Sequence, residues 1–116
     1  MLYLLLVKAS TQSEEGVLPS TALRESMDRY LDELDAAGVK VMAKGLAPSR
    51  EAIRIAFPAE GMEPVLTNGP FLPAEDVVAG FFLLEVASEA EALKWALKAP
   101  DPQGNGEGRL ELRRVY

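Results

Sequence analysis

Two apolar runs dominate the hydrophobic pattern of this chain, one at Leu2–Val7 and one at Val77–Val86. In the second run apolar residues occupy both alternating faces, and Glu85 is the only charged residue. A continuous apolar run of this length is typical of a strand that is covered on both faces. We therefore predict that these two segments are the central strands of a sheet.

The segment from Ser20 to about Ala37 has the spacing of an amphipathic helix. Its apolar stripe recurs every three or four residues and consists of Leu23, Met27, Tyr30, Leu31 and Leu34. Ser20 is a suitable N-cap, and Gly38 is a suitable residue to end the helix. A second helix is predicted after the capping box Ser88–Glu91, and Pro100 ends it. Its apolar side holds Ala92, Leu93, Trp95, Ala96 and Ala99.

Shorter alternating segments predict four more strands, at Val39–Gly45, Ala52–Phe57, Met62–Thr67 and Arg109–Tyr116. The connecting segments are predicted as loops at Ser10–Pro19 and Pro102–Gly108, and as a loop or helical turn at Leu72–Asp76. This order of elements is the ferredoxin-like split βαβ pattern with an inserted hairpin. We predict a single α+β domain over residues 1–116, whose antiparallel sheet carries both helices on one face.

The central strands are apolar on both faces, whereas two helices on one side can cover only one of them. A large apolar sheet face left in water is a liability. The simplest cover is a second copy of the chain, packed sheet to sheet about a two-fold axis. We therefore expect a homodimer.

The stretch Thr67–Phe71 connects the predicted fourth strand to the most apolar run. Asn68-Gly69 is a hairpin-turn signal, because both residues tolerate positive φ. Pro70 biases Gly69 toward extended geometry, and Phe71 is expected to be driven into whatever lies beneath the turn. The alternative to this structural interpretation is that Asn68 presents its amide at the mouth of a cleft.

Composition excludes several kinds of chemistry. The chain has no cysteine and no histidine, so thiol chemistry and the commonest general base and metal ligand are absent. No spacing of carboxylates resembles a calcium loop, and we predict no metal site and no cofactor.

The net charge of −6 argues against nucleic acid as a partner. Leu2–Val7 is too short to span a bilayer. We expect no membrane association and a cytoplasmic protein.

The whole chain resembles the YCII-related family, in particular its DGPF-motif branch. The matching segments are Val7–Ala9, Glu14–Ser20, Ala37–Val39, Gly45–Ser49, Thr67–Phe71, Ala79–Leu83 and Glu91–Ala96. The resemblance implies a dimeric α+β barrel with a cleft between sheet and loops in each subunit. Most members of this branch have no known biochemical function, and some are labelled transcription-related from gene neighbourhood alone.

The chain departs from the family pattern at ionisable positions. Asn68 stands at the usual Asp, and Gln103 stands where the late loop usually carries His. Pro73 and Glu75 replace the usual Glu and Lys. These departures weaken any catalytic role that the resemblance implies.

Six residues are candidates for ligand binding, namely Lys8, Lys44, Asn68, Phe71, Glu85 and Gln103. Lys8 is either a snorkelling side chain at the sheet edge or a cation that holds an anionic ligand, and Lys44 has the same two interpretations. Glu85 either lies outside the core or faces the barrel, where a buried carboxylate needs a partner and Arg54 or Arg113 is the expected one. The loop Gly104–Gly108 is not a phosphate loop, because it follows a helix and precedes a strand.

Function is predicted only in outline. The leading hypothesis is a small dimeric protein that binds a metabolite in a cleft between the sheet and the loops 67–76 and 100–108. The alternative is a lyase, isomerase or hydrolase that uses Lys8, Glu85 and Asn68 without metal or histidine. A third hypothesis, a transcription regulator, conflicts with the acidic charge.

Overall fold

Four antiparallel strands form the main sheet, in the order β2-β5-β1-β6. In this computed structural model, which describes residues 1–116, their bounds are β1 Leu2–Lys8, β2 Lys40–Gly45, β5 Val78–Glu85 and β6 Leu110–Arg114. Strands β3 (Ile53–Ala56) and β4 (Val65–Asn68) pair with each other in a separate hairpin. The helices are α1 (Thr11–Glu14), α2 (Thr21–Ala36) and α3 (Glu89–Lys98), and short 3-10 turns lie at Ser49–Glu51 and Ala74–Asp76.

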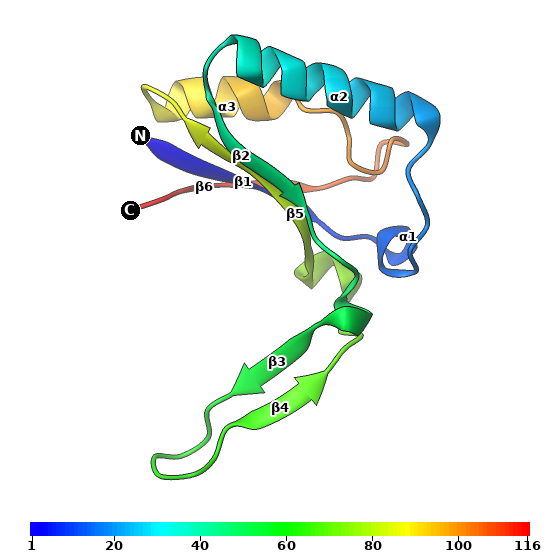
Figure 1. Ribbon diagram of the computed structural model, residues 1–116, viewed down its shortest axis with the longest axis vertical. Helices are drawn as coiled ribbons and strands as arrows, with labels where there is room; N and C mark the ends of the chain where they lie inside the picture. Colours follow the sequence, from blue (N-terminus) through cyan, green and yellow to red (C-terminus); the bar gives the residue numbers. More distant parts are fainter.

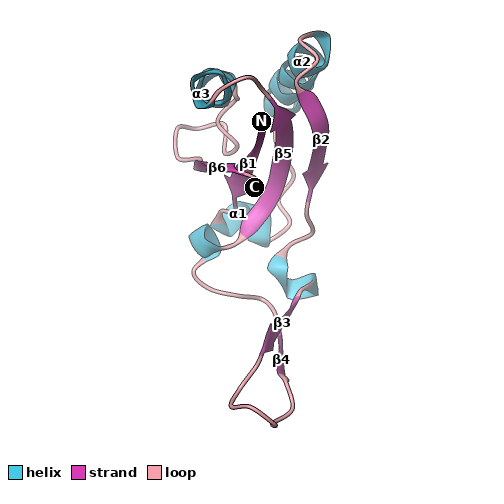
Figure 2. Ribbon diagram, turned by 90° about the vertical axis from the view of Figure 1, so that its left-hand side faces the viewer, coloured by secondary structure: helices cyan, strands magenta, loops and turns pink.

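Helices α2 and α3 lie side by side over one face of the sheet (Figures 1 and 2). The residues between this face and the helices form the core, and Leu5, Leu34 and Leu84 are fully buried there. The Tyr30 ring on α2 meets Phe82 on β5 edge to face, with 5.5 Å between centroids. The α+β, ferredoxin-like fold with an inserted hairpin is therefore confirmed.

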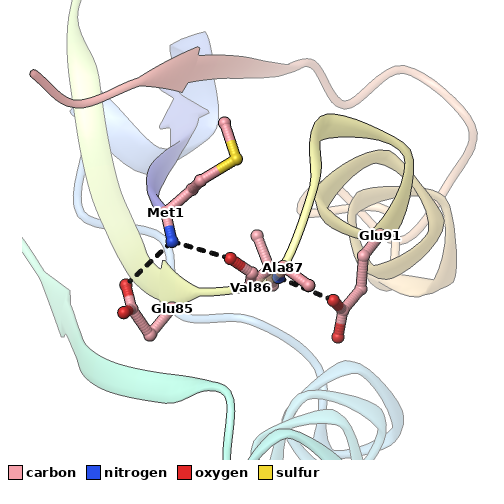
Figure 3. Close-up of polar contacts among 5 residues, drawn as sticks. All are labelled: Met1, Glu85, Val86, Ala87 and Glu91. Carbon is pink, nitrogen blue, oxygen red and sulfur yellow. Dashed lines mark hydrogen bonds and ion pairs between the residues drawn. The ribbon is translucent and has the colours of Figure 1, made fainter.

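The two long helices begin and end as the sequence predicts. The Ser20 hydroxyl accepts the Leu23 N–H at 3.1 Å, and Gly38 takes a positive φ of 71° just beyond the end of α2. The Ser88 hydroxyl accepts the Glu91 N–H at 3.2 Å. The Glu91 carboxylate in turn accepts the N–H of Ala87 at 2.8 Å (Figure 3). No helix is both long enough and apolar enough to cross a membrane.

The other face of the sheet has no element over it, and we call it the open face (Figure 1). Strand register places Leu4 opposite Leu83 and Leu6 opposite Phe81. These four side chains are half-buried and stand outside the core cluster. The central strands are thus apolar on both faces, but only the helix face is covered within one chain.

The β3–β4 hairpin projects away from the body of the molecule (Figures 1 and 2). It was predicted with β4 beginning at Met62, but β4 begins at Val65. Pro64 explains the later start, because proline has no N–H to donate to a strand ladder. The hairpin itself, one of the sequence predictions, is confirmed.

Two local predictions were wrong. Asn68-Gly69 does not reverse the chain, because the Gly69 N–H donates to the Ala52 carbonyl at 2.9 Å and continues the hairpin ladder. The segment 10–19 contains α1 rather than a plain loop, since the Ser10 hydroxyl accepts the Ser13 N–H in a capping box. The strand predicted at Val39–Gly45 is present as β2, with a register shift against β5 between Lys40 and Met42.

Candidate functional site

A cleft of about 990 Å³ opens where β1 ends. Its walls come from four segments that are distant in the sequence. They are the end of β1 with α1, the loop after β4, the loop 102–108 after α3, which we call the Gly-rich loop, and the start of β6. The charged residues that line it are Lys8, Glu14, Glu15, Glu75, Glu107 and Arg109. Pockets of several hundred Å³ are the size that proteins use for small ligands.

Lys8 and Arg109 are the two cations of the cleft. They come together because β1 and β6 are antiparallel neighbours, and the Lys8 N–H donates to the Arg109 carbonyl at 3.0 Å. The Lys8 side chain is half-buried and Arg109 is exposed. Neither takes part in an ion pair within the chain. Both charges are therefore free to meet a ligand.

Asp101 organises the Gly-rich loop that forms one rim of the cleft. Its carboxylate accepts the N–H of Gln103 at 2.8 Å and the N–H of Gly106 at 2.5 Å. The Gln103 N–H, followed by the N–H groups of Gly106, Gly108 and Gly104, lowers the pKa of Asp101 below its usual range, against a smaller opposing effect of desolvation. A Cβ at Gly108 would lie 2.0 Å from Asp101 Oδ1, so this position has no room for a side chain.

Phe71 forms the opposite wall and is buried, as the sequence predicts. Its backbone N–H donates to the Ser49 hydroxyl at 2.9 Å. The guanidinium of Arg54, on β3, lies 3.8 Å from the centroid of the ring, a cation–π contact. Ser49 thus fixes the backbone of Phe71, and Arg54 packs on its ring.

A hydrogen-bonded node behind Phe71 joins this loop to α1. Ser49 is only 2% exposed, and its hydroxyl donates to one carboxylate oxygen of Glu14. The Ser49 N–H donates to the other oxygen, Oε2, at 2.8 Å. Gly69 lies directly against the Ser49 backbone, because a Cβ there would sit 1.7 Å from the Ser49 carbonyl oxygen. The node fixes the distance between two walls of the cleft.

The structure brings together three of the six candidates, Lys8, Phe71 and Gln103, at the cleft. Lys44 lies elsewhere: strand register places it opposite Phe81 on the open face, and its segment also borders a second groove of about 500 Å³ between α2 and the sheet. Asn68 is the last residue of β4, opposite Ile53, and does not line the cleft.

Glu85 lies at the other end of the sheet from Lys8, opposite Leu2. Its carboxylate is 3.5 Å from the amino group of Met1, which also donates to the Val86 carbonyl at 2.8 Å (Figure 3). Glu85 therefore lies outside the core, which is the first of the two alternatives, and the arginine partner expected for a buried Glu85 is not needed. Arg113 is instead 3.8 Å from Glu111, and Arg54 stacks on Phe71.

Sequence reasoning missed Arg109, Glu14 and Ser49. Arg109 follows a Gly-rich loop and precedes a strand, a position from which a side chain can reach a loop-lined site. Glu14 and Ser49 lie in segments that carry the family resemblance, but nothing local connects residues so far apart in the chain. No group of three or more carboxylates is arranged to hold a metal ion.

Comparisons with known proteins agree with this architecture. One similar solved structure is 5-chloro-2-hydroxyhydroquinone dehydrochlorinase from Burkholderia phenoliruptrix AC1100, in complex with 2,5-dihydroxybenzoquinone. The two chains are 16% identical with a TM-score of 0.54, and the match covers 100% of this chain and 94% of the other. At this identity the likeness shows the fold alone. No curated protein sequence matches the chain. The sequence profile of the YCII-related domain matches residues 1–116, and the chain belongs to the YCII-related family.

Proposed function

We propose that this protein binds a small polar metabolite in the cleft between β1, α1, the loop 70–75 and the Gly-rich loop. The observation that carries the proposal is the pair Lys8 and Arg109. Two cations without ion-pair partners lie in one concave site on a chain whose net charge is −6. In an acidic protein, unpaired cations that meet in a cleft are suited to an anionic group of a ligand.

The rest of the lining narrows the class of ligand. Glu15, Glu75 and Glu107 also face the cleft, so a ligand that carried only negative charge would be repelled. The carboxylate of Glu14 is already occupied by two hydrogen bonds from Ser49. The lining favours a molecule that joins an anionic group to hydrogen-bond donors, as hydroxy acids and amino acids do.

Thermal denaturation with a panel of such molecules tests this proposal. The panel contains lactate, malate, alanine, aspartate and hydroxybenzoates. A ligand at about 100 times its Kd stabilises the folded chain by about 2.7 kcal/mol, which raises the Tm of a domain of this size by about 10 °C. Lys8→Met and Arg109→Met should each reduce the rise. Lys94→Met is the matched control, because Lys94 is exposed on α3 and lies outside the cleft. A rise that both cleft variants retain in full would contradict the proposal.

A second candidate function is an enzyme acting on a small aromatic metabolite. It is favoured by the dehydrochlorinase of similar fold, whose structure holds a dihydroxybenzoquinone. The three residues expected to carry such chemistry do not converge, since Lys8 lines the cleft whereas Asn68 and Glu85 lie elsewhere. Chloride release from 5-chloro-2-hydroxyhydroquinone, lost in Lys8→Met and retained in Lys94→Met, would support this function. No release above the uncatalysed rate would argue against it for that substrate.

We further propose that two copies pack through their open faces. Support comes from the apolar pairs Leu4 with Leu83 and Leu6 with Phe81, which no element of the same chain covers. Leu83→Arg places a charge in the middle of this face and should give a monomer by light scattering. A dimer of unchanged stability in that variant would count against packing through the open face.

A further inference from the structure

The hairpin of residues 53–68, which we call the arm, has two unlike faces. The more apolar one carries Ile53, Ile55, Leu66 and Asn68, and the mixed one carries Arg54, Ala56, Val65 and Thr67; we call them the apolar and the polar face of the arm. Pairing puts Ile55 opposite Leu66, with Ile53 on the same face, and Arg54 opposite Thr67 on the other face. Ile53, Ile55 and Leu66 are 60%, 56% and 66% exposed. An antiparallel ribbon with this alternation normally packs its apolar face against something. Here the apolar face of the arm is in water.

The apolar exposure continues beyond the paired strands. Phe57 and Met62, near the tip of the arm, are also largely exposed. An isolated two-stranded hairpin is at best marginally stable in water, and strands β3 and β4 contact chiefly each other. The arm therefore gains little from its own chain and has much to gain from a partner.

The base of the arm is firmly attached to the body. The Gly69 N–H donates to the Ala52 carbonyl at 2.9 Å, and the neighbouring Ser49 hydroxyl accepts the Phe71 N–H. Arg54, on the polar face, is stacked on Phe71 of the same chain. Because the polar face is used within the chain, the apolar face is the one left for a partner.

The chain exposes more surface than is expected for a compact monomer of its mass. A folded monomer of 12.6 kDa is expected to expose about 6,200 Å², whereas this chain exposes 7902 Å². The excess of about 1,700 Å² is roughly twice what each partner contributes to a standard interface. The radius of gyration is 16.1 Å, against about 13 Å expected for a compact chain of this length. Both values reflect an arm that projects from the body. This area is enough for an interface that includes both the arm and the open face.

Charge points to a second copy of the chain as the partner. The segment from Phe57 to Asn68 carries Glu60 and Glu63 and no basic residue. The open face carries Lys44, opposite Phe81, and this lysine has no ion pair within the chain. A two-fold partner thus offers an apolar surface for the apolar face of the arm and a cation for its acidic tip.

We propose that the arm of each chain lies across a second copy of the protein, with Ile53, Ile55 and Leu66 buried in the interface. The inference rests on the proposed dimer and adds to it a specific contact that the open face alone does not require. Each subunit would then contact its partner through its arm. The base of the same arm adjoins the Phe71 wall of the cleft.

Sedimentation equilibrium of charge variants on the two faces of the arm tests this. Ile55→Glu and Leu66→Glu should each raise the dimer Kd about tenfold or more, because a buried apolar side chain is replaced by a charge. Thr67→Glu is the matched control on the polar face and should leave the Kd within about threefold, the range of surface charge effects. Circular dichroism checks that each variant is folded.

Hydrogen exchange on the unmodified chain gives a second measurement, which needs no substitution. Amides of the arm should exchange more slowly in the dimer and faster on dilution below its Kd, whereas core amides such as that of Leu84 should not change. Arm amides that exchange equally fast at all concentrations would overturn the inference. If Leu83→Arg gives monomers while Ile55→Glu and Leu66→Glu leave the Kd unchanged, the arm inference is wrong and the dimer proposal stands. An unmodified chain that is monomeric at all concentrations would overturn both.

Discussion

Ser49 and Glu14, separated by 35 positions in the sequence, form the hydrogen-bonded node behind the wall of the cleft. The Glu14 carboxylate accepts both the hydroxyl and the backbone N–H of Ser49. The same hydroxyl accepts the N–H of Phe71. One buried side chain therefore holds α1, the turn after β2 and the loop after β4 in fixed relation.

Ser49→Ala should destabilise the protein by about 1–3 kcal/mol, because the Phe71 N–H and the Glu14 carboxylate each lose a buried partner. Urea denaturation measures this difference. Ser26→Ala is the control, since the Ser26 hydroxyl only accepts an exposed hydrogen bond from Arg29. Equal stability of the two variants would show that the node does not hold these segments together.

Gly69→Ala should be more damaging than its size suggests. The new Cβ would lie 1.7 Å from the Ser49 carbonyl oxygen, so the backbone must move apart at the base of the arm. We expect a loss of about 2 kcal/mol or more in the free energy of unfolding. Gly45→Ala is the matched control, because nothing lies within 4 Å of a Cβ at that position. Similar Tm values for the two variants would contradict the close approach.

Acid should loosen the Gly-rich loop at a pH below the usual range of an aspartate. Backbone N–H groups, that of Gln103 first, lower the pKa of Asp101 in the folded chain. The ionised carboxylate therefore stabilises the fold fully above the unfolded pKa of about 3.9, and this stabilisation is lost as the pH falls through the lower folded pKa. Asp101→Asn should be less stable than the unmodified chain at neutral pH. The difference should shrink on acidification, and a difference independent of pH between neutral and acid solution would be inconsistent with this role.

Tyr30 should make the core sensitive to alkali. Burial, with a smaller contribution from Glu33, raises the pKa of Tyr30 to about 12, so its stabilisation is complete below the unfolded pKa of about 10 and is lost as the pH rises through 12. Its hydroxyl donates to the Trp95 carbonyl at 2.8 Å. Tyr30→Phe should cost about 1 kcal/mol at neutral pH, and this cost should diminish above pH about 10. Guanidinium denaturation of both proteins at neutral pH and above pH about 10 checks whether the cost of the substitution falls as the pH rises.

The elements of the fold could be predicted because each leaves a local pattern. The stripe of α2, its cap at Ser20 and the apolar run of β5 each identify an element within a short stretch of sequence. The extended course of Asn68-Gly69 could not be predicted, because it depends on the Ala52 carbonyl and the Ser49 backbone, which lie far from the dipeptide in the sequence.

The site was predicted only in part for the same reason. Lys8, Phe71 and Gln103 line one cleft, because the expected loops carry Phe71 and Gln103 to the end of β1. Antiparallel pairing of β1 with β5 puts Glu85 at the opposite end of the sheet from Lys8, a consequence of topology that no single segment reveals. The partnership of Glu14 with Ser49 likewise needs the folded chain.

The central claim is that Lys8 and Arg109 meet a small polar anionic ligand in the cleft, and amide NMR spectra test it most directly. The isotope-labelled chain is titrated with the hydroxy acids, amino acids and hydroxybenzoates of the thermal panel. We predict saturable shifts of the amide signals of Lys8, Gln103, Gly106 and Arg109 for at least one of these compounds, abolished by Lys8→Met and retained in Lys94→Met. Saturable shifts that instead map to the groove beside Lys44, or no saturable shifts with any of them, would contradict the claim.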